Sequence, residues 1–251
     1  MTSDNTKITE NKEAPITEHL EEIRYRVILC FIVFTAFFFI SWNYSDFFAS
    51  QLIKPLKSCK PDVKLAALSV TETFFTSMKL AFYCSLAFST PFFLWHSWKF
   101  VEPGLKPREK NIANILIIPS MLCFIFGSAF CYLFLLPVSI KFLLTGMGDN
   151  FIAVFSYSSY VDFSILFLTL IGIVFQAPLL MIFLDLLGLF PVERMKKNRK
   201  ITVLGAFIIG AILSPPDVFS QILVSLPLII LIEIGFILIN IIRKYIPNLA
   251  E

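Results

Sequence analysis

Six long apolar runs constrain this chain more than any other feature of its sequence. An α-helix needs roughly 20 apolar residues to cross a hydrocarbon core of ~30 Å. Candidate runs lie at about 25–44, 73–96, 112–138, 161–187, 200–213 and 218–240. Hydrophobic residues make up 57% of the chain and charged residues 16%, which is more apolar surface than a soluble domain can bury. The sequence therefore predicts a single-domain, all-α integral membrane protein of six transmembrane helices, and it excludes a soluble enzyme, a nucleic-acid-binding protein and a disordered chain.

Two of these runs depart from the length of a straight crossing. The run 112–138 is too long, and kinks are expected at Pro119, Gly127 and Pro137. The run 200–213 gives only ~20 Å of helix at 1.5 Å per residue. It either crosses locally thinned lipid or forms a shallow hairpin with the run 218–240. A non-helical turn would then form the tip of this hairpin at Ser214, Pro215, Pro216 and Asp217.

Lysine and arginine are concentrated in alternate hydrophilic segments. Segments 1–26, 97–111 and 188–200 and the C-terminal tail hold 15 of them, and the opposite loops hold five. The positive-inside rule therefore places both termini in the cytoplasm, although four lysines in the loop 45–72 oppose the rule locally. The N-terminal segment is rich in acids, which is a poor start for a cleavable signal peptide.

No motif for an enzyme or an ATP-driven pump occurs in the chain. There is no phosphate-binding GxxxxGK[ST] sequence, and no Cys/His spacing typical of a metal site. We therefore expect no cofactor and no metal. A small-solute secondary transporter and a membrane enzyme remain as alternatives, but the unusual polar residues lie mainly in loops rather than inside the spans.

The segment 17–26 predicts an amphipathic helix on the cytoplasmic membrane surface before the first span. Its apolar stripe consists of Leu20, Ile23 and Val27. Glu22 and Arg26 are four residues apart, so they can form an ion pair along the helix. The segment is either a solvated anchor or a site at which Glu22 offers a carboxylate to a cationic ligand.

The loop 97–111 carries a second candidate acid. A Pro-Gly turn precedes Pro107, which suits the first position of the next helix. Glu109 then lies in the first turn, where the helix dipole favours an anion. The acid either balances the neighbouring basic residues or binds a ligand, and Phe100 either packs at the interface or belongs to the same site.

Two polar residues interrupt the later spans. Gln176 precedes Pro178 in the fourth run, and an amide in hydrocarbon needs a partner. Gln176 either joins helices of this chain, for instance through a carbonyl that Pro178 frees, or receives a polar group from another subunit. We expect Glu233 in the last run to lie near the cytoplasmic interface and to be paired there.

These motifs together resemble the TatC family, the multispanning receptors of the twin-arginine protein translocase. Residues 18–26 (EHLEEIRYR) are similar to the family's HLxELRxR sequence. Residues 100–105 (FVEPGL), followed by Glu109, are similar to its F-x-x-PGL…E signature. Residues 214–221 (SPPDVFSQ) are similar to TPPDxxSQ. The resemblance covers nearly all of residues 16–245.

The resemblance implies a concave, glove-like bundle with two short C-terminal spans, in the cytoplasmic membrane of a bacterium. It implies that twin-arginine signal peptides bind at the cytoplasmic face, and that folded precursors are exported with the proton-motive force. The implied signal-peptide site comprises Glu22, Arg24, Phe100 and Glu109. Partner helices would dock at Gln176 and Pro178, and the structural turn would comprise Pro215, Pro216, Asp217 and Gln221. The implied partners are single-span subunits of the TatA and TatB types, precursor proteins and further copies of this chain, with no nucleic acid.

The chemistry of the implied site fits its ligand. A guanidinium binds a carboxylate through two parallel hydrogen bonds, and a lysine ammonium does not. One position departs from the family pattern, because many bacterial relatives carry Glu where this chain has Gln176. An amide does not titrate, which argues against proton transfer at this position and leaves a plastid thylakoid or mitochondrial inner membrane open as the location.

Overall fold

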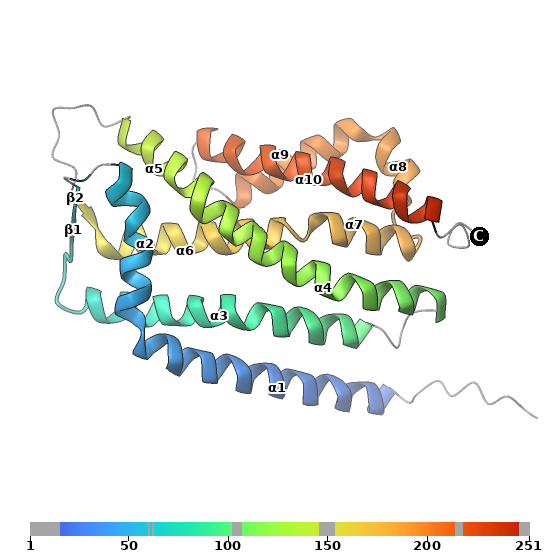
Figure 1. Ribbon diagram of the computed structural model, residues 1–251, viewed down its shortest axis with the longest axis horizontal. Helices are drawn as coiled ribbons and strands as arrows, with labels where there is room; N and C mark the ends of the chain where they lie inside the picture. Colours follow the sequence, from blue (N-terminus) through green and yellow to red (C-terminus); the bar gives the residue numbers. More distant parts are fainter. Residues whose placement is uncertain are drawn as a thin grey trace, which may run out of the picture.

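The computed structural model describes residues 16–59, 61, 63–101, 107–145, 154–213 and 218–245, and these are almost entirely helical (Figure 1). The helices are α1 (Ile16–Asn43), α2 (Ser45–Cys59), α3 (Glu72–Val101), α4 (Pro107–Phe130), α5 (Leu136–Thr145), α6 (Tyr157–Val174), α7 (Ala177–Leu186), α8 (Val192–Lys197), α9 (Arg199–Leu213) and α10 (Val218–Tyr245). A π-helical segment, η2 (Cys131–Leu135), joins α4 to α5. Two short strands, β1 (Lys64–Ala66) and β2 (Val154–Ser156), pair in parallel.

The six predicted runs correspond to α1, α3, α4–η2–α5, α6–α7, α9 and α10, so the expected all-α architecture is observed. Within the described part of the chain, four segments are long and apolar enough to cross a membrane: Glu21–Asn43, Asn114–Thr145, Tyr157–Leu186 and Val218–Lys244. Helix α9 has only 15 residues, as its short run predicted. Helix α3 has 30 residues but is less apolar, because Ser, Thr, Tyr and His interrupt it.

The long helices run side by side and leave two different ends (Figure 1). At the right in that view lie the start of α1, the end of α3, the start of α4, α8 and the end of α10. We call this the basic end, because α8 and the last turn of α10 carry Arg194, Lys196, Lys197, Arg243 and Lys244. At the left lie α2, both strands and the start of α6, which we call the capped end.

Two expectations about the N-terminal third are wrong. The segment 17–26 is not a separate surface helix, because α1 continues without a break from Ile16 to Asn43. No Gly or Pro lies within this range to end the first helix. The loop 45–72 is also not a simple loop, since its first part forms α2 and buries Leu52 and Leu56.

The helix breaks follow the prolines only in part. Before Pro137 the backbone widens into η2, where the N–H of Leu136 donates to the carbonyl of Cys131. Before Pro178, helix α6 ends and α7 begins, because proline has no N–H to continue the ladder. Gly127 has a different role from the predicted kink: a Cβ there would lie 2.6 Å from Cγ of Phe175, so the glycine permits close packing of α4 on α6.

Side-chain hydrogen bonds close the capped end. The hydroxyls of Tyr132 and Tyr160 donate to the α2 carbonyls of Gln51 (2.8 Å) and Leu52 (2.7 Å). The carboxylate of Glu72, the first residue of α3, accepts from the Ser156 hydroxyl at 2.6 Å and the Ser158 N–H at 3.0 Å. It also accepts from the N–H groups of Leu68 and Ser69. These hydrogen bonds, the one from Ser156 foremost, lower the pKa of Glu72 to about 2.

Candidate functional site

Three helices that carry the predicted recognition residues meet at the basic end. From α1, Nη1 of Arg26 donates to the carbonyl of His96 on α3 at 3.5 Å. From α3, Nζ of Lys99 donates to Oδ1 of Asn114 on α4 at 3.3 Å. Helix α1 packs against α3 along its length, and α3 also contacts α4. The structure thus brings the start of α1 and the start of α4 to opposite sides of the same α3 end.

The carboxylate of Glu22 already binds a guanidinium. Its Oε1 accepts from Nε of Arg26 at 3.1 Å and also from Nη2 of the same residue. This confirms the predicted ion pair, whose side chains are 36% exposed for Glu22 and 20% for Arg26. Arg24 is exposed and lies two residues from Glu22, so it projects from a different side of α1. The structure does not bring Arg24 onto the Glu22 carboxylate.

The second candidate acid lies at the start of α4. This helix begins at Pro107, as the sequence predicted, and Glu109 is in its first turn. The side chain of Glu109 and the loop 102–106 lie outside the described residues. Phe100 is half-buried one residue before the end of α3, on the same side of the molecule. The described residues therefore give the backbone frame of the site and one of its two acids.

Gln176 lies at the break between α6 and α7 and joins this break to α4. Its Nε2 donates to the carbonyl of Ser120 at 2.9 Å, which is an interhelical hydrogen bond. The sequence had suggested a carbonyl that Pro178 frees as the acceptor. The structure instead uses a carbonyl of α4. Gln176 is half-buried, Pro178 is buried, and Oε1 of Gln176 accepts no hydrogen bond from any described residue.

Helices α9 and α10 form the close hairpin that the short fifth run allowed. Nε2 of Gln221 on α10 donates to the carbonyl of Phe207 on α9 at 3.1 Å. Gly210 permits the close approach, because a Cβ at this position would overlap Oγ of Ser225. The turn residues Pro215, Pro216 and Asp217 lie outside the described residues.

Polar contacts that the sequence did not reveal hold the basic end together. The carboxylate of Asp185 on α7 is 5% exposed and accepts from Nη2 of Arg243 at 2.7 Å, from Nε of Arg243 at 3.2 Å and from the N–H of Val192 at 2.8 Å. Arg243 also pairs with Glu193 of α8. A hydrogen bond from its own N–H, together with Arg243, lowers the pKa of Glu193. No sequence pattern links these positions, since Asp185 and Arg243 are 58 residues apart.

Glu233 is paired, as the sequence predicted. Its Oε2 accepts from Nη2 of Arg199 at 3.1 Å. The guanidinium of Arg199 also lies 5.8 Å from the ring centre of Phe236. These contacts join the start of α9 to α10 near the basic end.

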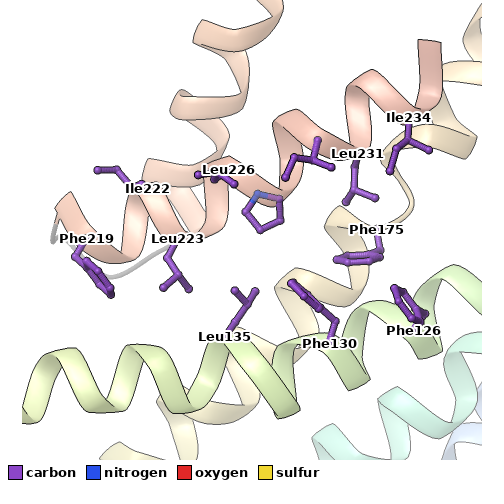
Figure 2. Close-up of a pocket in the computed structure, with 12 residues that line it drawn as sticks. Phe126, Phe130, Leu135, Phe175, Phe219, Ile222, Leu223, Leu226, Leu231 and Ile234 are labelled. Atoms are coloured by element: carbon purple, nitrogen blue, oxygen red, sulfur yellow. The ribbon is translucent and has the colours of Figure 1, made fainter. Parts of the chain in front are cut away.

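A large apolar cavity of about 590 Å³ lies between α4, η2, the residue that follows α6, and α10. Figure 2 shows Phe126, Phe130 and Leu135 on one wall, Phe175 beside them, and the side chains of α10 opposite. Its lining is apolar, which suits hydrocarbon rather than a hydrophilic solute. Within the described ranges, no three His, Cys, Asp or Glu residues gather in a group that could hold a metal ion.

Comparison with known proteins identifies similar chains. The model of the TatC family, described as Sec-independent protein translocase protein (TatC), matches residues 18–227. A Sec-independent protein translocase protein TatC from Carboxydothermus hydrogenoformans is 34% identical over 93% of this chain and 96% of its own length. The TatC protein of Aquifex aeolicus is 34% identical over 89% of this chain and 94% of its own. A crystal structure of the twin-arginine translocase receptor TatC superposes with a TM-score of 0.77 at 33% identity, covering 89% of this chain and 98% of that one.

Proposed function

The chain belongs to the TatC family of Sec-independent protein translocase proteins, and we propose from this premise that its basic end binds the twin-arginine motif of signal peptides. The protein is a membrane-embedded receptor component of the twin-arginine translocase and not a small-solute transporter. The proposal specifies which residues bind the signal peptide, on which side of the membrane they lie and which subunits assemble with this chain. We also propose that signal-peptide binding and translocation require no catalysis by the chain itself.

The observation that carries the proposal is the contact between Glu22 and Arg26. It supports Glu22 as an acceptor for a guanidinium, because the carboxylate is partly exposed and already takes two N–H donors from one. A second guanidinium would bind Glu109 in the first turn of α4, across the end of α3. Two such carboxylates favour two consecutive arginines over two lysines, because only the guanidinium donates in parallel to both carboxylate oxygens. Phe100 would flank the pair, and Arg24 would contact the polypeptide nearby.

We place the basic end in the cytosol and the membrane in a bacterium. The excess of Lys and Arg in the segments that meet at this end supports the orientation. Export would draw on the proton-motive force, since the chain has no nucleotide-binding motif. Gln176 would contribute a docking group rather than a titrating one, with Oε1 available to a donor on a single-span subunit of the TatA or TatB type. Further copies of this chain would complete the complex.

Site-specific photocrosslinking tests the receptor site. Photoreactive residues at positions 22, 100 and 109 are expected to crosslink a precursor with a twin-arginine signal peptide and to lose this crosslink with a twin-lysine precursor. A residue at position 68, on the exposed turn of the capped end, is the matched control and is expected to give no crosslink. Equal crosslinking of both precursors at positions 22, 100 and 109 would contradict the assignment.

A further inference from the structure

An ion pair lies between α3 and α6, away from the proposed receptor site. Nζ of Lys79 contacts Oδ2 of Asp162 at 2.9 Å and Oδ1 at 3.2 Å. The hydroxyl of Ser158 donates to Oδ2 at 3.4 Å. The side chains are 48% exposed for Lys79 and 43% for Asp162, so both charges reach the surface of the molecule. The contacts described for the receptor site do not involve this pair.

The two charges lie in the wall of a recess of about 550 Å³ that opens on the outside of the bundle. Helices α1, α3 and α6 contribute its lining, which consists of Phe38, Met78, Lys79, Phe82, Tyr83, Asp162 and Leu166. Apart from the ion pair and the Tyr83 phenol, the lining is apolar. The recess therefore combines one positive and one negative group with a hydrophobic surface.

Neighbouring aromatic residues indicate the depth of the recess in the membrane. Trp42 packs against Phe74 with ring centres 5.6 Å apart, and tryptophan is typical of the membrane–water interface. Lys79 follows Phe74 by five residues, which is ~8 Å of helix. Asp162 lies five residues after the start of α6. Both helices have their N-termini at the capped end, and helical side chains tilt toward the N-terminus. The two charges consequently point toward the nearer interface, where lipid headgroups meet acyl chains.

We propose that this recess binds the headgroup of a phospholipid with a primary amine, of the phosphatidylethanolamine class. The lipid phosphate accepts a hydrogen bond from Lys79, and the lipid ammonium donates to Asp162. Lys79 has three N–H donors, and the carboxylate of Asp162 has lone pairs beyond those it uses in the pair. Two half-exposed charges at this depth are costly unless polar groups surround them. The apolar lining accommodates the start of the acyl chains.

Charge complementarity selects this headgroup over others. Asp162 repels a purely anionic headgroup, such as that of phosphatidylglycerol. Phosphatidylcholine carries the same phosphate and the same net charge, but its quaternary ammonium has no N–H to donate. The difference between the amine and the choline lipid thus depends on one charge-assisted hydrogen bond to Asp162, which corresponds to a roughly tenfold preference.

Competition for lipid binding tests the proposal. The full chain is reconstituted in nanodiscs that contain equal amounts of phosphatidylethanolamine, phosphatidylcholine and phosphatidylglycerol, and the lipids retained on mild detergent extraction are counted by native mass spectrometry. The unmodified protein is expected to retain the amine lipid about tenfold over choline. Asp162→Asn should bring this ratio close to one, and Lys79→Gln should lower retention of every phospholipid.

Two further variants keep the outcome interpretable. The double variant Lys79→Gln/Asp162→Asn leaves no unpaired charge, so it should remain folded by circular dichroism and should also lose the preference. Glu233→Gln removes one partner of another exposed interhelical pair, at 3.1 Å from Arg199, and should leave the preference unchanged. A preference that is absent from the unmodified protein, or that persists in Asp162→Asn, would overturn the proposal. Neither result bears on the receptor site, which the crosslinking experiment tests separately.

Discussion

The two ends of the molecule use carboxylates in opposite ways. At the capped end, Glu72 accepts four hydrogen bonds from its own chain, three of them from the backbone. At the basic end, Glu22 binds the guanidinium of Arg26, a flexible side chain that is partly exposed to water. A carboxylate held by fixed backbone donors cannot exchange them, whereas one that binds an arginine side chain can accept another arginine. The capped end is therefore suited to stability, and the basic end to the recognition that we propose for it.

The largest effect on this difference is expected from reversing the charge of Glu22, the acid whose guanidinium partner can exchange. Glu22→Lys should leave the protein inserted in the membrane and reduce export of a folded reporter with a twin-arginine signal at least tenfold, because the site then repels guanidinium. Glu109→Lys should have the same effect. Reporter activity on the far side of the membrane measures the result.

Glu21→Lys is the matched control, since Glu21 is the exposed neighbour of Glu22 and undergoes the same change of charge. It should export the reporter at close to the normal rate. Equal loss in the variants of Glu21 and Glu22 would show that total charge matters there and not a specific acceptor.

The basic end also contains one acid, Asp185, that accepts a backbone N–H as Glu72 does and is in addition buried. Asp185→Ala should lower the free energy of unfolding by about 3 kcal/mol, because it leaves the Val192 N–H unpaired and removes the main partner of Arg243. Thermal unfolding in detergent measures the change. Glu233→Gln, which breaks an exposed pair, should cost less than about 1 kcal/mol. Equal losses in the two variants would contradict the distinction between buried and exposed pairs.

A smaller effect is expected from one hydrogen bond at the capped end. Tyr160→Phe removes the donor to the Leu52 carbonyl at 2.7 Å and should cost about 1 kcal/mol of unfolding free energy. Export should be unaffected, since the proposed receptor site lies at the other end. Loss of export at unchanged stability would show that the two ends are coupled.

The smallest effect concerns the pH dependence of the Glu72 contacts. The pKa of Glu72 falls from 4.5 to about 2 on folding. The ionised carboxylate therefore makes its full contribution to the stability of the fold above pH 4.5, and this contribution disappears as the pH falls toward 2. The difference in melting temperature between the unmodified protein and Glu72→Gln should be constant from pH 7 to about 5 and shrink below that. A difference that grows on acidification would contradict this sign.

Features that depend on neighbours in sequence could be predicted, and features that depend on distant partners could not. The apolar runs gave the long helices, and the spacing of Glu22 and Arg26 gave their ion pair. Pro107 marked the start of α4. The pairing of Lys79 with Asp162 joins positions 83 residues apart, and no local pattern encodes it.

Helix α2 was missed for a related reason. The segment lies between two long apolar runs and was therefore expected to be a loop. In the folded chain it buries Leu52 and Leu56, and Tyr160 from a distant helix donates to one of its carbonyls. The strands β1 and β2 likewise form only because each supplies the other's partners. Burial and pairing of this kind arise in the packed chain and leave little trace in a short window of sequence.

The π-helical turn at Cys131–Leu135 is a place where the chain could lose one residue without changing the direction of the side chains that follow. An α-helix rotates each successive residue by about 100°, so a deletion within α4 or α5 would swing every later side chain to a new face. The wider turn already holds about one residue more than an α-helical turn. A deletion there would tighten it to regular geometry and leave Leu136 and Ile140 facing the interior. The helical segment α4–η2–α5 should thus tolerate the loss of one residue within η2 but not within α4 or α5.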